Sequence, residues 1–394
     1  MTTTDITLSL PGPDGTWEPL TLRQPTHWPT PTGPLTARSA YAAVPVAPRH
    51  DADNVPGAPA LIDWDATLGM RQRIWDAGLG VAEAMDTAQR GMGLDWDGAA
   101  ELIERSAAHA RAAGGTIAAG ANTDHLPADA TPTLTEVIDA YRHQVEVIQR
   151  AGARVIVMAS RHLAAVATHP EEYAQVYESV LADVDQPAIL HWLGPMFDPD
   201  LTGYWGSEDL DEAHRTVADL IARGADRIEG IKVSLLEARR EMDLRAELAR
   251  RAPGVRLYTG DDLNYPDLIL GDGRHHSDAL LGVFAVVYPA ASAALQALQA
   301  ADDDGARRIL EGTVALGRHI FAAPTQSYKA GVAFWSWLSG HQPGFQMLYG
   351  MHSARSAAHL IEVFRLADRA GLLLDPPVAA ARMSAFLQVA GYRP

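Results

Sequence analysis

The chain has 394 residues, of which 47% are hydrophobic and 21% charged, so it can bury a core large enough for one large domain with additions or for two domains. Its 32 lysine and arginine residues face 49 aspartate and glutamate residues, and the formal charge of −17 argues against nucleic acid or an anionic membrane as a partner. The absence of cysteine excludes disulfides, thiolate nucleophiles and cysteine-ligated metal sites.

Residues 1–37 differ in pattern from the rest of the chain and are expected to form an N-terminal extension. The segments 6–10 and 20–22 alternate as strands do, and the turn residues of 11–15 separate them, which predicts a hairpin. Four prolines between 24 and 34 predict an extended linker. With no basic, apolar leader and no run of 18 apolar residues, we expect a cytoplasmic protein.

Residues 38–289 alternate between short apolar strands and amphipathic helices, as βα units do. Eight strands within about 250 residues favour a (β/α)8 TIM barrel. A doubly wound sheet would usually carry a glycine-rich loop after its first strand, whereas residues 47–50 read Ala-Pro-Arg-His. The predicted strands are 41–46, 80–85, 116–120, 154–159, 188–191, 228–233, 256–258 and 279–285.

The predicted barrel helices have recognisable ends. Asp63 and Asp95 precede helices as capping residues, and Gly114 and Gly152 follow them. Beyond residue 289 no further strand is predicted, and residues 290–394 form a helical C-terminal region. The predicted barrel helices are 64–76, 96–113, 134–150, 170–182, 210–223, 236–250 and 265–270, and the C-terminal helices are 291–301, 306–320, 325–338, 353–370 and 377–390.

Lys232 lies inside the apolar strand 228–233. Burial disfavours its ammonium form, so the neutral amine becomes available to attack a carbonyl and form a Schiff base. Alternatively, the ammonium reaches solvent or pairs with Glu229 or Glu237. The strand alone favours this alternative.

In such a barrel the active site forms at the carboxyl ends of the strands. The residues there are rich in polar and titratable side chains. They include Asp86, Thr87, Gln89, Arg90, Asn122, Asp124, His125, Arg161, His162, His191, Lys232, Ser234, Asp261, Asp262 and the loop 271–278.

The order of these segments resembles the dihydrodipicolinate synthase and N-acetylneuraminate lyase family of class I aldolase barrels. The likeness covers residues 38–340. It rests on Asp86-Thr87-Ala88-Gln89-Arg90 in place of Gly-Thr-Thr-Gly-Glu, on Pro187-Ala188-Ile189-Leu190-His191 in place of Pro-Val-Ile-Leu-Tyr, on Gly230-Ile231-Lys232, on Thr259-Gly260-Asp261-Asp262 and on Tyr328-Lys329-Ala330.

The resemblance implies that Lys232 is the Schiff-base lysine and makes the fold a (β/α)8 barrel. It also implies that His191 replaces the tyrosine that relays protons in the family. Imidazole suits this role near neutral pH. Of the paired threonines that bind the keto-acid carboxylate in the family, only Thr87 remains, and Asp86, Gln89 and Arg90 are new.

We therefore predict a class I lyase in which Lys232 forms a Schiff base with a keto acid or keto sugar. His191 is the acid–base group, and Thr87 relays protons or orients the carbonyl. The polar second loop suggests a hydroxylated substrate and a retro-aldol step in carbohydrate breakdown. No cofactor or metal is predicted, and family likeness suggests a homo-oligomer. The predicted substrate contacts are Asp86, Gln89, Arg90, Asn122, Asp124, Ser234 and Asp261.

Three other functions are kept as alternatives. An imine-forming dehydratase or hydrolase would use the same lysine, and a sugar-acid binder would not need its amine. A metal-dependent aldolase or hydrolase would use loop histidines, although no His-x-x-x-His spacing supports it and solvated histidines are favoured. The candidate metal ligands are Asp124, His125, Asp272, His275, His276 and Asp278.

Arg90 and Arg161 could clamp an anion, but surface arginines are the commoner case.

Overall fold

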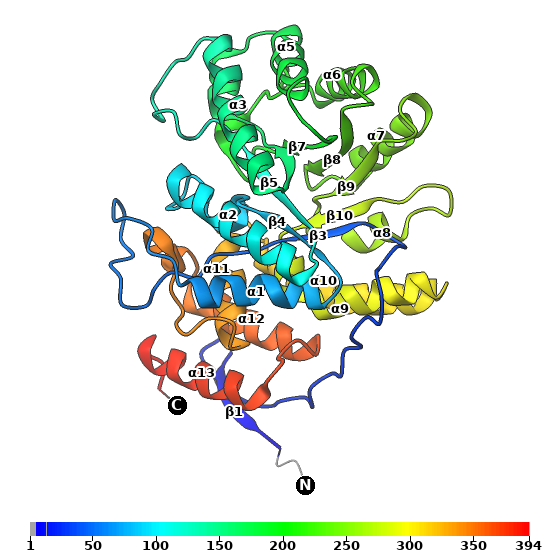
Figure 1. Ribbon diagram of the computed structural model, residues 1–394. Coiled ribbons are helices and arrows are strands. Elements are labelled where there is room, and N and C mark those ends of the chain that lie inside the picture. Colours follow the sequence, from blue (N-terminus) through cyan, green and yellow to red (C-terminus); the bar gives the residue numbers. More distant parts are fainter. Residues whose placement is uncertain (1–4, 13, 394) are drawn as a thin grey trace.

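The structure, a computed structural model, describes residues 5–12 and 14–393. Its centre is a closed barrel of parallel strands in the order β10-β3-β4-β5-β6-β7-β8-β9 (Figure 1), which confirms the predicted (β/α)8 fold. The barrel strands are β3 (Ala40–Ala43), β4 (Gly80–Glu83), β5 (Ile117–Ala121), β6 (Arg154–Val157), β7 (Ala188–Leu193), β8 (Ile228–Ser234), β9 (Arg256–Thr259) and β10 (Asp278–Leu281).

Helices connect successive strands and surround the barrel (Figure 1). Asp63 and Asp95 accept hydrogen bonds from Ala66 N and Gly98 N, so both predicted caps are confirmed. The barrel helices are α1 (Trp64–Asp76), α2 (Trp96–Ala113), α3 (Leu134–Ala151), α4 (Arg161–Val166), α5 (Pro170–Leu181), α6 (Leu210–Arg223), α7 (Ala238–Arg251), α8 (Tyr265–Leu270) and α9 (Phe284–Gln299), with short 3-10 turns η1 (Asp86–Ala88) and η2 (Pro199–Leu201).

The barrel interior is filled by side chains rather than open. Tyr41, Ile156, Ile189, Tyr258 and Leu280 belong to one buried cluster there. Because side chains fill the interior, a ligand site is expected at one end of the barrel.

The predicted eighth strand, 279–285, is wrong at its carboxyl end. Strand β10 ends at Leu281, and helix α9 begins at Phe284 and continues through Pro289. An apolar run of this kind has no periodicity that separates a buried strand from a buried helix. The predicted boundary at residue 289 therefore falls inside a helix that follows the last barrel strand.

The C-terminal helices pack beside the barrel and against the N-terminal hairpin (Figure 1). The backbone N–H of Arg23 donates to Asp368, and the Trp28 indole donates to Gly371 O. Residues 1–4 of the predicted extension, Pro13 of its turn and Pro394 lie outside the described residues. The elements are β1 (Thr7–Pro11), β2 (Trp17–Thr21), α10 (Asp303–Ile320), η3 (Thr325–Ser327), α11 (Tyr328–Leu338), η4 (Leu348–Ala354), α12 (Ala357–Arg369) and α13 (Pro376–Val389).

Within the described part of the chain, no helix combines the length and apolar character needed to cross a membrane.

Candidate active site

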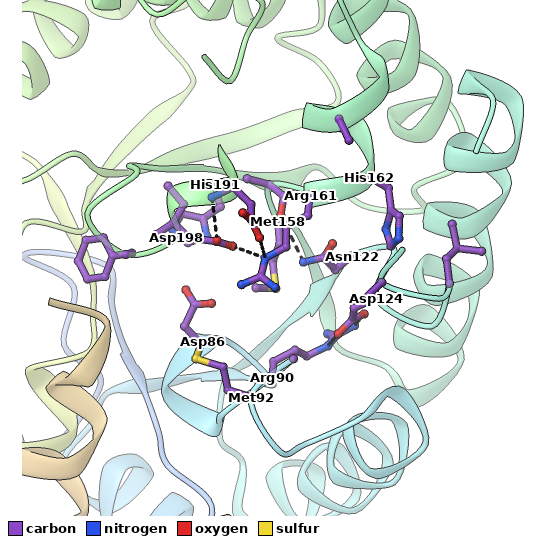
Figure 2. A pocket seen from close by; sticks show the side chains of 18 of the residues that line it. Asp86, Arg90, Met92, Asn122, Asp124, Met158, Arg161, His162, His191 and Asp198 are labelled. Carbon is purple, nitrogen blue, oxygen red and sulfur yellow. Dashed lines mark hydrogen bonds and ion pairs between the residues drawn. The ribbon is translucent and has the colours of Figure 1, made fainter. Parts of the chain in front are cut away.

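Two adjoining cavities lie at the carboxyl ends of the barrel strands. The larger has a volume of about 530 Å³ (Figure 2), and the smaller holds about 10 Å³. Asp86, Leu193 and Phe197 line both, so they form the boundary between them. The smaller cavity is also lined by Thr87, Lys232, Ser234, Asp262 and Tyr328, and the larger by Arg90, Asn122, Asp124, Arg161, His162, His191, Asp198 and Asp200.

Lys232 lies in β8 and lines the smaller cavity. Its exposed fraction is 7%, and burial lowers the pKa of its ammonium below the usual 10.5, while Asp262 and Asp86 act in the opposite direction. Glu229, the alternative partner, instead contacts Arg154 and Arg256. Lys232 is thus a buried amine next to a cavity, the arrangement that a carbonyl nucleophile requires.

Lys232 and Lys329 are the only lysines among the 32 lysine and arginine residues of the chain. Both are buried, whereas the exposed basic residues are arginine. Burial lowers the pKa of Lys329 to about 8, and its Nζ donates to Gln326 O at 3.2 Å. The rarity of lysine was a signal in the sequence that our prediction did not use.

His191 lies beside Lys232, because the two residues are paired in the register of β7 and β8. Its Nε2 is 3.2 Å from Ser234 Oγ, and its Nδ1 is buried with no hydrogen-bond partner among the described residues. Burial, and then the nearby Lys232, lower the pKa of His191 well below 6.5. The imidazole is therefore neutral at physiological pH, and it is a weaker base than a solvent-exposed imidazole.

Thr87 contacts a residue that the sequence did not assign to the site. Its Oγ1 lies 2.7 Å from the phenol oxygen of Tyr328, which is supplied by α11. Burial and the nearby Asp86 raise the pKa of Tyr328 well above 10, so the phenol remains protonated. The sequence assigns no role to Tyr328, which is part of the family resemblance only through the segment Tyr328-Lys329-Ala330.

Asp262 lines the smaller cavity in place of the predicted Asp261. The carboxylate of Asp261 accepts hydrogen bonds from the backbone of Leu263 and Asn264, and lies away from the cavity. Asp262 accepts a bond of 2.7 Å from Val283 N, and burial raises its pKa to about 7 although Lys232 opposes the shift. Asp262, and not the predicted Asp261, is thus the aspartate that lines the cavity.

Gln89 and Arg90 are positioned differently from the prediction. The amide nitrogen of Gln89 donates to Leu348 O and its amide oxygen accepts from Leu348 N, so the side chain points away from both cavities. Arg90 is 4% exposed, which corrects the surface interpretation, and it lines the larger cavity. Its guanidinium donates to both Asp124 oxygens at 2.8 and 2.7 Å, so it holds Asp124 in place.

The remaining predicted contacts, Asp86, Asn122 and Asp124, line the larger cavity, and Ser234 lines the smaller one. Figure 2 shows Asp86 pointing into the cavity space. Arg161 also lines the larger cavity, where its Nε is 2.8 Å from Asp198 and 3.4 Å from Asp200.

The two groups of candidate metal ligands lie at opposite ends of the barrel. His125 follows β5 at the carboxyl end, whereas residues 271–277 precede β10. Including that loop among the strand ends that build the site was wrong. Over residues 5–12 and 14–393, no three or more His, Cys, Asp or Glu side chains are grouped closely enough to hold a metal ion.

The sequence matches, over residues 8–392, the family described as "Protein of unknown function (DUF993)". The chain belongs to this family. A comparison with curated proteins found no match.

Several solved structures share the fold of this DUF993 protein. One is a monomeric dihydrodipicolinate synthase variant, with a TM-score of 0.64, 14% identity and coverage of 87% of this chain and 100% of the other. The enzyme of Thermotoga maritima has a TM-score of 0.64 and 13% identity, and the match covers 85% of this chain and 99% of the other. The enzyme of Acinetobacter baumannii, complexed with pyruvate, has a TM-score of 0.62 and 16% identity, with coverage of 86% of this chain and 100% of the other. The predicted family resemblance is thereby confirmed for the fold.

Proposed function

We propose that this DUF993 protein is a class I lyase that forms an imine between Lys232 and the carbonyl carbon of a keto acid or keto sugar. We further propose a retro-aldol reaction in carbohydrate breakdown. The observation that carries the proposal is the buried amine of Lys232, with its lowered pKa, at the wall of a cavity at the carboxyl end of the barrel. This is the place where barrels of this class assemble their active sites.

The first step is attack of Lys232 Nζ on the carbonyl carbon. The carbonyl oxygen takes up protons and leaves as water, which gives an iminium ion. Thr87 and Tyr328 support this step because their hydroxyl groups are hydrogen-bonded to each other and both line the same small cavity as the amine. A phenol that stays protonated can donate through Thr87 to the departing oxygen.

The second step breaks a C–C bond. A base removes the proton from the hydroxyl group on the carbon of this bond that lies farther from the iminium ion, and that carbon leaves as an aldehyde. The electrons of the broken bond form the C=C bond of an enamine, while the C=N electron pair moves to the nitrogen. His191 suits the base because it is neutral, lines the larger cavity and is paired with Lys232 across the strands. Protonation of the enamine carbon and hydrolysis of the imine then restore the lysine.

The test is reduction by sodium borohydride in the presence of a panel of keto acids and keto sugars, followed by intact mass measurement. The chain offers a matched pair of variants, Lys232→Met and Lys329→Met, which each remove one buried amine at similar side-chain volume. We expect one adduct per chain in the parent and in Lys329→Met, and none in Lys232→Met. Peptide mapping has only two lysines to separate.

An adduct that maps to Lys329, or a panel that gives no adduct, would overturn the proposal. Product analysis with the trapped compound then tests the reaction. Release of an aldehyde supports C–C cleavage, whereas loss of water alone would assign an imine-forming dehydratase.

A further inference from the structure

We propose that the substrate is a polyhydroxylated carbonyl compound with no carboxylate on its carbonyl carbon, so a keto sugar in place of a 2-keto acid. The inference rests on the proposed imine function and narrows its substrate class. It follows from the charges that line the two cavities.

The covalent structure of a 2-keto acid fixes where its carboxylate must lie. The carboxylate is bonded directly to the carbon that forms the imine, so it has to enter the small cavity together with that carbon. This cavity holds only about 10 Å³, close to the volume that one water molecule needs. The walls of the cavity therefore make direct contact with whatever group is bonded to the imine carbon.

Those walls are unsuited to an anion. Asp86 and Asp262 both line the cavity, and Lys232 is the one cationic side chain among the residues that line it. Lys232 is itself the group that becomes the imine. A substrate carboxylate would be desolvated beside Asp86, and the lining offers it no cation besides the iminium nitrogen formed from Lys232, so the buried charge is costly.

Asp86 shows how this cavity wall differs from the wall that binds a carboxylate in the dihydrodipicolinate synthase family. The resemblance places Asp86 where the dihydrodipicolinate synthase family has a glycine, and it places Ala88 at the second of the two threonines that bind the keto-acid carboxylate. A threonine offers a hydroxyl donor to an anion, whereas an ionised aspartate offers only acceptors. The loss of a threonine at position 88 and the gain of a carboxylate at position 86 therefore change the wall from one that binds a carboxylate to one that repels it.

The lining of the larger cavity is also unsuited to an anion. Its two arginines are already paired, Arg90 with both oxygens of Asp124 and Arg161 with Asp198 and Asp200. Asp86 adds a further carboxylate to the lining. Carboxylate oxygens accept hydrogen bonds from hydroxyl groups, so a polyol chain matches this wall and an anion does not.

Two further features fit a hydroxylated chain. Over residues 5–12 and 14–393, the buried Nδ1 atom of His191 has no hydrogen-bond partner. His191 lines the larger cavity, so a substrate hydroxyl would give this nitrogen a hydrogen bond. The volume of about 530 Å³ lies within the range of small-molecule sites. The carbonyl end then enters the small cavity while the hydroxylated remainder occupies the large one.

The experiment compares pyruvate with hydroxyacetone, because these two ketones differ mainly by a carboxylate in place of a hydroxymethyl group. Each is incubated with the protein at equal concentration and reduced by borohydride, and the adduct is measured by intact mass. The parent is compared with Asp86→Thr, which replaces the carboxylate by a hydroxyl group, and with the isosteric Asp86→Asn. The control Asp226→Asn removes an exposed carboxylate in the loop before β8.

We expect the parent to favour hydroxyacetone, and both Asp86 variants to raise the pyruvate-to-hydroxyacetone ratio by at least about tenfold. Using this ratio cancels the intrinsic reactivities of the two ketones. An unchanged ratio in both variants, or a parent that favours pyruvate, would overturn the inference and leave the Lys232 imine standing. An adduct with neither ketone nor any panel compound would overturn the proposed function and this inference with it.

Discussion

The Oγ1 of Thr87 and the phenol oxygen of Tyr328 are 2.7 Å apart in a buried hydrogen bond. The contact joins the turn after β4 to the first residue of α11, 241 positions later in the chain. Through it the C-terminal helices contribute a hydroxyl group to the cavity that holds Lys232. The barrel alone would leave Thr87 without this partner.

Replacing Tyr328 by phenylalanine tests whether this hydroxyl pair carries a proton. We expect turnover of the trapped carbonyl compound to fall by about 10²- to 10⁴-fold, the usual contribution of general acid–base catalysis. Borohydride trapping given a long incubation should still yield the Lys232 adduct, because the amine remains. The measurement is the ratio of turnover to final adduct yield.

Two comparisons make the Tyr328 result specific. Thr87→Val should give a similar loss, and the double variant should lose little more than either single variant, since both remove one relay. Tyr349→Phe, on an exposed tyrosine, should behave as the parent. Full turnover in Tyr328→Phe would remove the phenol from the mechanism.

The pH dependence of imine formation should report the pKa of Lys232. Only the neutral amine attacks, so the rate should rise with pH and reach half its maximum below 10.5. Asp262 stabilises the ammonium form and so raises this pKa. Its removal in Asp262→Asn must therefore lower the pKa, and the rising limb should move to lower pH.

Initial rates of adduct formation across a pH series would measure that shift. Asp226→Asn, which removes a charge from an exposed position, should leave the limb in place. A limb that moves to higher pH in Asp262→Asn would contradict the assignment of the amine to Lys232.

His191 should act after imine formation. We expect His191→Asn to reduce turnover by about 10²- to 10⁴-fold while the adduct still forms. Ser234→Ala removes the hydrogen bond that orients the ring and keeps the imidazole. A bond of this kind contributes about 1 kcal/mol, so the loss of turnover should be about fivefold. Equal losses in both variants would mean that His191 has a structural role alone.

The sequence predicted what local patterns determine. Strand and helix periodicities, with caps such as Asp63, identified the barrel, and one lysine in an apolar strand identified the amine next to the cavity. The register of β7 and β8 then places His191 beside Lys232, as the positions of both in their strands suggested.

The predicted site residues differ from the structure where long-range contacts or the path of a single loop determine the position of a side chain. Gln89 is held by Leu348, 259 residues away, and no local pattern indicates such a contact. Asp261 and Asp262 are adjacent and chemically identical, so only the path of the loop determines which one lines the cavity. Tyr328 comes from a helix whose packing on the barrel cannot be inferred from spacing.

The buried ion pair of Arg71 and Glu83 supports the strand that precedes Asp86 and Thr87. Both side chains are fully buried, and the guanidinium contacts the two carboxylate oxygens at 2.9 and 2.8 Å. Arg71→Ala leaves Glu83 as an unpaired buried charge, so we expect the free energy of unfolding to fall by about 3–5 kcal/mol. Urea denaturation followed by circular dichroism measures it.

Two variants separate the charge effect from packing. Arg239→Ala removes an exposed partner of Asp243 and should change stability little, because exposed pairs are screened by solvent. Arg71→Met combined with Glu83→Leu replaces both charges by apolar groups and should recover most of the loss. If the double variant were as unstable as Arg71→Ala, shape and not the unpaired carboxylate would account for the cost. Slower formation of the Lys232 adduct in a folded Arg71→Ala protein would further show that the pair also positions the turn that carries Asp86 and Thr87.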